Sequence, residues 1–236
     1  MVKYIQRVMF KFFTEQDIKD VYATFVGNKN EEYYKTHENL YQQVQQLVPS
    51  WNSGWADYPR LATIVDLHNW IAKYNLQFDK VLSTSKNDPE LTLIRYNKLD
   101  LAEYDGTNFD LHTLNLDTKD YDLVIINQTL EHVYNPFVCV KNVYDHIAPG
   151  GYFFTSVPMI NINHNMPFYY WGINPTGLAL TCMAQGFKVL EVGFWGSPEY
   201  ILSMFAYNGW PSFHSIGNTK NNVNFICQCW ILCQKL

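Results

Sequence analysis

The stretch from Asp122 to Pro158 reads DLVIINQTLEHVYNPFVCVKNVYDHIAPGGYFFTSVP, and it decides the fold. Residues 121–127 are almost continuously apolar, as a strand buried on both faces of a parallel sheet must be. A helical stretch follows at 135–147, and a Pro-Gly-Gly turn leads into a second apolar strand at 151–158. A strand, a helix and a second strand in this order indicate a right-handed crossover between parallel neighbours.

Further short strands are predicted on both sides of this stretch. They cover 80–85, 98–104, 187–196 and 225–233, which are runs rich in β-branched, aromatic and other apolar residues bounded by turn residues. A second helix is predicted at 174–185, and Gly186 follows it, where a left-handed C-cap suits glycine. Alternating strands and helices predict a doubly wound α/β fold, in which ligands bind at the carboxyl ends of the strands.

The first third of the chain has a helical periodicity instead. Apolar residues recur at three- and four-residue spacing over 15–26, 31–48 and 58–74. We therefore expect one domain, in which residues 1–79 form an N-terminal helical cap or lid and residues 80–236 form the α/β core.

Composition narrows the class of protein. The 236 residues carry a formal net charge of -5 with no run of Lys or Arg, which argues against nucleic acid as a partner. No apolar stretch reaches the ~20 residues of a membrane span, and the N-terminus lacks the pattern of a secretory signal. Five cysteines without paired spacing suggest a reducing compartment. We expect a cytoplasmic protein that acts on a small molecule or a glycan, with no membrane partner and an undefined oligomeric state.

From residue 122 onward the sequence resembles the small-molecule and sugar class I S-adenosylmethionine-dependent methyltransferases. In that family the fourth strand leads into a Leu-Glu-His-Val helix start, and a Pro-Gly-Gly turn precedes the fifth strand. The resemblance continues through His164, Pro167, the aromatic residues after them and Gly186. It implies a Rossmann-like, seven-stranded, mostly parallel sheet, with S-adenosylmethionine as cofactor and S-adenosylhomocysteine as product.

The sequence departs from the family at the end of the first strand. The family has a glycine-rich turn there, which lets the backbone approach the cofactor closely. Residues 81–90 read VLSTSKNDPE and contain no glycine, and the next strand follows so soon that the usual helix must be shortened or lost. Either a loop built on Ser83, Thr84 and Ser85 holds the cofactor, or the chain is a methyltransferase-like binding or scaffold protein that has lost it.

The resemblance also suggests the other residues that contact the cofactor. Glu103, after the second strand, would accept both ribose hydroxyls, with Asp105 as the runner-up. Asp110 and Leu111 stand twelve and eleven residues before Asp122, as an Asp-Leu pair does in the family. Two more candidates, which could instead cap a helix beginning near Thr129, are Asn127 and Gln128.

His164 and His132 are the candidates for a general base, because a hydroxyl acceptor must lose its proton as the methyl group arrives. His164 ranks first, since loops after the fifth strand face the transfer centre in this fold. The alternative is a surface role for His164 and a structural Glu131-His132 pair. No metal is expected, because no acidic neighbours cluster at the end of the fourth strand.

Substrate contacts are assigned to aromatic residues and one arginine. Each has a plainer alternative, namely core packing for the aromatic rings and a surface ion pair for the arginine. These candidates are Trp55, Tyr58, Arg60, Tyr169, Tyr170 and Trp171. The leading prediction is O-methylation of a small molecule or of a sugar hydroxyl.

Overall fold

A computed structural model describes residues 12–51, 56–103 and 109–236. The N-terminal part contains α1 (Glu15–Tyr22), the π-helical turn η1 (Ala23–Gly27), α2 (Glu31–Thr36), α3 (Leu40–Leu47) and α4 (Tyr58–Tyr74). The strands are β1 (Lys80–Ser83), β2 (Lys98–Leu101), β3 (Tyr121–Asn127), β4 (Ile147–Pro158), β5 (Phe187–Trp195) and β6 (Gln228–Lys235). The remaining helices are α5 (Pro136–His146), α6 (Pro175–Ala184), α7 (Pro198–Tyr207) and α8 (Phe213–Ile216), with short 3-10 turns η3 (Pro89–Leu93), η4 (Leu130–His132) and η5 (Val223–Phe225).

The strands form one sheet in the order β2-β1-β3-β4-β6-β5. The pairs β1–β2, β1–β3 and β3–β4 are parallel, and β6 runs antiparallel between β4 and β5. The order reverses between β1 and β3, because the chain builds β1 and β2 outward in one direction and then returns to add β3 on the other side. The predicted doubly wound, mostly parallel α/β fold is therefore confirmed.

The expected count of seven strands is wrong for the part of the chain that the structure describes, where the sheet has six. The missing strand would have followed β2. Residues 104–108 lie outside the described residues; beyond them the Asp110 carboxylate accepts the His112 backbone N–H at 2.9 Å and the Asp110 carbonyl accepts the Thr113 N–H at 3.0 Å, so residues 110–113 form a turn. An aspartate that bonds to the backbone two residues ahead favours a turn over an extended strand.

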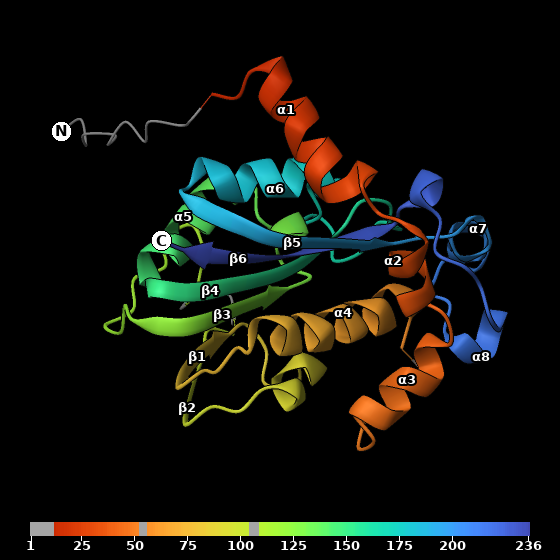
Figure 1. The fold of residues 1–236 in the computed structure, drawn as a ribbon, viewed down its shortest axis with the longest axis horizontal. Coiled ribbons are helices and arrows are strands. Elements are labelled where there is room, and N and C mark those ends of the chain that lie inside the picture. The colour runs from red at the N-terminus through yellow and green to blue at the C-terminus, as the bar shows by residue number, and fades with distance from the viewer. Residues whose placement is uncertain (1–11, 52–55, 104–108) are drawn as a thin grey trace.

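Helices cover both faces of the sheet (Figure 1). Alternate residues of β3 illustrate the two layers. Val124 and Ile126 belong to the core shared with α5 and α6, whereas Leu123 and Ile125 belong to the core shared with α3 and α4. A strand with both faces buried explains why residues 121–127 are almost all apolar.

The N-terminal helices pack against the sheet rather than standing apart from it. His37, at the end of α2, donates from Nε2 to Asp66 Oδ1 of α4 at 2.9 Å, and the Trp230 indole of β6 donates to the other Asp66 oxygen at 3.0 Å. All three side chains are buried. The stretch predicted as one helix over 31–48 is two helices, because Asn39 adopts the left-handed conformation with φ 55°.

Helix α4 is the longest helix and connects the N-terminal part to β1. It begins after Asp57, has Pro59 in its first turn, where a missing N–H costs nothing, and ends at Asn75 in the left-handed conformation. No helix among the described residues is both long and apolar enough to cross a membrane.

Candidate active site at the carboxyl edge of the sheet

The carboxyl ends of β1, β3 and β4 lie side by side, and two adjoining cavities open there. The larger has a volume of about 560 Å³, and the smaller has about 380 Å³. Gln128 and His132 line both cavities, so the two cavities adjoin at these side chains. Each volume lies within the range of ligand sites, about 300–1,000 Å³.

The loop after β1 closes on itself. The Ser83 hydroxyl donates to the Ser85 carbonyl at 2.9 Å and accepts the Ser85 N–H at 3.2 Å. The Thr84 N–H donates to the Ile125 carbonyl at 3.3 Å. Neither cavity is lined by Ser83, Thr84 or Ser85, whereas Asn87 and Pro89 of the same loop line the larger one. The helix that usually follows this loop is reduced to η3, as the short spacing predicts.

Arg60 reaches the larger cavity from α4 and meets two carboxylates of that loop. Its guanidinium lies 3.0 Å from Asp88 Oδ1 and 2.8 Å from Glu90 Oε2. Glu90 is fully buried, and burial raises its pKa to about 7, because one guanidinium offsets only part of the cost of two carboxylates. The arginine therefore belongs to a buried cluster rather than to a surface ion pair.

The two residues that end β3 take up different roles. The Asn127 side chain is buried, and its Oδ1 accepts the Ser156 hydroxyl of β4 at 3.1 Å. The buried Asn127 amide nitrogen makes no hydrogen bond within 3.5 Å among the described residues, and its nearby donor acts to lower the pKa of the Asp88 carboxyl. Gln128 has φ 49° and donates to the Ser156 hydroxyl at 3.2 Å. Neither residue caps a helix at Thr129, since that segment is the short turn η4 and α5 is capped by the Asn135 side chain.

His132 and His164 meet at the wall of the larger cavity. Their ring centroids are 4.9 Å apart, and the ring planes are perpendicular. His132 Nδ1 lies 2.7 Å from the Phe168 carbonyl, and His164 Nδ1 lies 2.9 Å from the Ile162 carbonyl. A carbonyl can only accept, so Nδ1 carries the proton in both rings and each neutral ring keeps a lone pair on Nε2.

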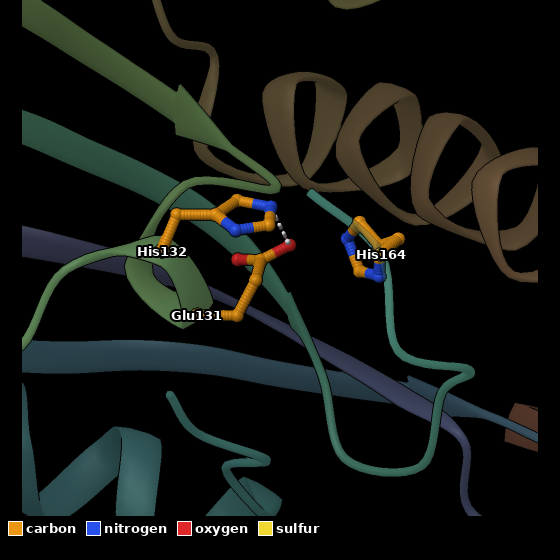
Figure 2. Close-up of side chains that lie close together, drawn as sticks. All are labelled: Glu131, His132 and His164. Atoms are coloured by element: carbon orange, nitrogen blue, oxygen red, sulfur yellow. Dashed lines mark ion pairs between the residues drawn. The ribbon is translucent and has the colours of Figure 1, made fainter. Parts of the chain in front are cut away.

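The Glu131 carboxylate points toward the His132 ring, and His164 lies on its other side (Figure 2). Its side chain is fully buried, its Oε1 lies 3.8 Å from His132 Nε2, and burial raises its pKa to about 8. Neither carboxylate oxygen has a hydrogen-bond partner among the described residues.

The acidic residues predicted to contact the cofactor lie near the smaller cavity and the β1 loop. The exposed Glu103 carboxylate accepts the Lys86 backbone N–H at 3.1 Å, so it faces the β1 loop from the end of β2. Asp110 and Leu111 line the smaller cavity together with Gln128. Asp105, the alternative to Glu103, lies outside the described residues.

The predicted aromatic contacts are scattered. Tyr58 lies away from both cavities: its ring stacks on Trp195 in the core, with centroids 5.1 Å apart. Trp171 lines neither cavity, because its indole donates to the Val133 carbonyl at 2.8 Å. Tyr170 lines the smaller cavity, and the Tyr169 ring centroid is 4.7 Å from that of His164. Trp55 lies outside the described residues.

Several cavity residues escaped sequence reasoning. Asp57 lines the larger cavity, accepts the Tyr200 hydroxyl at 2.8 Å, and has its pKa raised by burial. Trp210 donates to Asn161 Oδ1 at 2.8 Å and lies edge-on to His164. These contacts join segments far apart in the chain, so no local pattern announced them. The acids at 88 and 90 did carry a signal, because they directly follow a strand that enters the site.

Comparison with known proteins complements this geometry. A family model described as a methyltransferase domain matches residues 59–184, which is more than half of the chain. A search by sequence against curated proteins finds no match.

Solved structures with a similar fold have little sequence in common with this chain. An S-adenosylmethionine-dependent methyltransferase from Clostridium acetobutylicum has 11% identity and a TM-score of 0.48, with 84% of this chain and 99% of that chain covered. One from Mesorhizobium loti has 12% identity and a TM-score of 0.37, with 73% and 87% covered. Phosphoethanolamine N-methyltransferase 2 of Haemonchus contortus, in complex with S-adenosyl-L-methionine, has 10% identity and a TM-score of 0.41, with 72% and 52% covered.

Proposed function

The chain belongs to the methyltransferase-domain family, of the class I type whose cofactor is S-adenosylmethionine, and on that premise we propose that it methylates a hydroxyl oxygen of a small molecule or a sugar. The observation that carries the proposal is the pair of imidazoles, His132 and His164, at the wall of the 560 Å³ cavity. Both rings keep an Nε2 lone pair, because each Nδ1 proton is held by a backbone carbonyl. Such lone pairs suit the removal of a proton from a hydroxyl.

The donor set around the smaller cavity fits the adenosine half of the cofactor. Glu103 and Asp110 offer carboxylates to the ribose hydroxyls and the adenine edge, and Leu111 offers an apolar wall. We assign Gln128 to the border between cofactor and substrate because it lines both cavities.

When bound, S-adenosylmethionine supplies a methyl group on a positively charged sulfur, which is already activated for transfer. The chain therefore needs only to orient the acceptor oxygen, exclude water and take up one proton. We assign the proton uptake to His164, with His132 beside it. Tyr169, which packs against His164, would help to hold that ring in place.

The lining of the larger cavity supports a polar, sugar-like acceptor. Asn161 and Gln228 present amides, and Arg60 presents a guanidinium already balanced by carboxylates. Trp51 and Trp210 add flat apolar surfaces. Aromatic walls with a few convergent polar groups are typical of sites that bind small polar ligands.

A second candidate function is that of a binding or scaffold protein without cofactor. One observation favours it: the loop after β1 is closed by its own hydrogen bonds, and Ser83, Thr84 and Ser85 line neither cavity. The two candidates differ in whether the chain binds the cofactor at all.

Calorimetric titration with S-adenosylmethionine and S-adenosylhomocysteine separates them. We expect binding of both, weakened at least tenfold in Glu103→Ala, because two charge-assisted hydrogen bonds to the ribose are lost. Glu31→Ala, which removes an exposed acid of α2, is the matched control and should bind as the wild type does. Absence of binding of either compound at millimolar concentration would reject the enzymatic proposal.

The hydroxyl acceptor is tested by formation of S-adenosylhomocysteine with sugar, phenol and amine acceptors. We expect turnover with a sugar or a phenol, and a fall in kcat of about 10²–10⁴-fold in His164→Ala, the usual contribution of a general base. The affinity for S-adenosylmethionine should be unchanged in that variant. Turnover with amines alone would contradict the proposal.

A further inference from the structure

Three side chains with metal-ligating atoms converge beside the larger cavity. Glu131 and His132 come from the turn η4 after β3, and His164 comes from the loop after β4 (Figure 2). One ligand atom of each residue, a carboxylate oxygen or an imidazole nitrogen, lies within 4.8 Å of the other two. The contact between Glu131 Oε1 and His132 Nε2, at 3.8 Å, belongs to this group.

The Glu131 carboxylate is the observation that most needs an explanation. The side chain is fully buried, and neither of its oxygens has a hydrogen-bond partner among the described residues. An isolated buried carboxylate is costly, and buried charges in proteins are as a rule paired or bound to metal. The two imidazoles lie beside this carboxylate and, like it, offer lone pairs to a cation. A cation held between them would satisfy all three side chains at once.

The two imidazoles are oriented as metal ligands usually are. A metal-bound histidine almost always donates its second ring N–H to a carbonyl or a carboxylate, which fixes the tautomer and aims the other nitrogen at the ion. His132 does so through Nδ1 to the Phe168 carbonyl, and His164 does so to the Ile162 carbonyl. Both Nε2 atoms are thereby left as ligands.

We propose that Glu131, His132 and His164 bind one divalent transition-metal ion, with zinc as the reference ion. Two imidazoles and one carboxylate make a borderline donor set, which suits zinc or ferrous iron and disfavours magnesium. Bonds of about 2.0–2.1 Å to a tetrahedral zinc place ligand atoms roughly 3.4 Å apart. Separations of up to 4.8 Å therefore require the side chains to close by up to roughly 1.4 Å on binding.

This inference deepens the proposed function. It rests on that function for the identity of the molecule that would occupy the remaining coordination positions of the ion. His132 and His164 line the larger cavity, so an ion between them would present its remaining positions to the acceptor. The site would then prefer acceptors with an oxygen donor, such as a sugar diol or a phenol. In the metal-loaded protein the imidazoles would act as ligands instead of bases, and the ion would lower the pKa of the acceptor hydroxyl so that its proton could pass to water.

The site was not expected from the sequence. No metal was expected because metal-dependent relatives would need clustered carboxylates after the fourth strand, and this chain has one acid there. The third ligand comes from residue 164, beyond the next strand, and only the fold brings it to the turn η4.

The test is a titration of the metal-stripped full chain with Co²⁺, followed by visible absorption, with Zn²⁺ as the competitor. We expect one equivalent of Co²⁺ to give a ligand-field band that Zn²⁺ abolishes. Glu131→Gln, which keeps the shape of the side chain, and His164→Ala should each weaken Co²⁺ binding more than tenfold. His214→Ala, which removes an exposed histidine of α8, is the matched control and should leave the titration unchanged.

The outcomes separate this inference from the proposed function. Absence of the band, or an equal band in Glu131→Gln and His164→Ala, overturns the metal site. Far-UV circular dichroism identifies a variant that has failed to fold, and the Glu131→Gln titration then decides. Stoichiometric Co²⁺ binding in a protein that methylates no acceptor supports the metal site and rejects the function. Methylation by a protein that binds no Co²⁺ does the reverse.

Discussion

Buried charged side chains form ion pairs and hydrogen bonds at the carboxyl edge of the sheet. Arg60 balances Asp88 and Glu90 on the β1 side, while Asp57 accepts a hydrogen bond from Tyr200. Burial raises the pKa of all three of these acids. The loop that lacks glycine is thus fixed by ion pairs and side-chain hydrogen bonds.

Glu90 makes a testable contribution to the pH dependence of stability. Its pKa is raised from 4.5 to about 7, so the folded chain holds this proton more tightly than the unfolded chain does. The contribution is present below the unfolded pKa and is lost as pH rises through about 7. Glu90→Gln should therefore gain stability over the wild type between pH 5 and pH 8, by about 1–3 kcal/mol, since one pKa unit is worth about 1.4 kcal/mol.

Urea denaturation at the two pH values measures this difference. Glu31→Gln, which neutralises an exposed acid on α2, controls for a general loss of charge. Its difference in unfolding free energy from the wild type should be the same at both pH values. An identical difference between Glu90→Gln and the wild type at pH 5 and pH 8 would show that Glu90 stays ionised throughout.

At the same scale, sequence reasoning located part of the candidate site and missed the rest. Gln128, His132 and His164 line the cavities because they follow strands whose ends were predicted. Tyr58 was predicted to contact substrate because it is aromatic. In the structure it packs instead on Trp195, which lies more than 130 residues away in the chain. Contacts of that kind depend on the fold and leave no local pattern.

At the scale of elements, all six strands and the helices α4, α5 and α6 follow from periodicity and turn residues. Apart from the helix expected over 31–48, which divides at Asn39, the elements that were mispredicted are short. The seventh strand that the resemblance implied is absent from the described residues, where residues 110–113 form a turn, and the helix expected near Thr129 is the three-residue turn η4. In both places a side chain bonds to the nearby backbone, either Asp110 to His112 or Asn135 to Val138, and so sets where an element begins. Side-chain hydrogen bonds to nearby backbone compete with regular structure, and hydrophobic periodicity does not register them.

Close packing between elements predicts the effect of one glycine. A Cβ at Gly193 of β5 would overlap the Trp230 indole of β6 and the Asp66 carboxylate of α4. Gly193→Ala should therefore destabilise the protein by about 1–3 kcal/mol, the usual cost of overpacking. Gly209→Ala is the matched control, because a Cβ there meets nothing nearer than 3.8 Å. Thermal denaturation compares the two, and equal midpoints would contradict this account of the β5–β6–α4 contact.

At the scale of the whole molecule, the N-terminal helices share one core with the sheet. Leu40 and Val44 of α3, Leu61 and Ile64 of α4 and Phe154 of β4 belong to the same buried cluster. The buried His37–Asp66–Trp230 contact adds a polar connection between α2, α4 and β6. We therefore propose that residues 1–79 and 80–236 form one folding unit.

A single unfolding transition is the corresponding prediction. Far-UV circular dichroism, which follows the helices and strands, and tryptophan fluorescence, which follows the core, should give the same midpoint in urea. The His37→Ala variant should lower that midpoint for both signals together. Two separated transitions, or a shift in one signal alone, would mean that the cap unfolds independently.

The position of β6 has a consequence for how the protein is made. This strand lies between β4 and β5 although it follows both in the chain. While a ribosome is still synthesising the protein, β4 lacks a neighbour on one side and β5 has no strand to pair with until residues 228–235 emerge. From the completion of β5 at residue 195 until β6 emerges, the nascent chain therefore carries two open, apolar strand edges, which are the surfaces that aggregate or recruit chaperones.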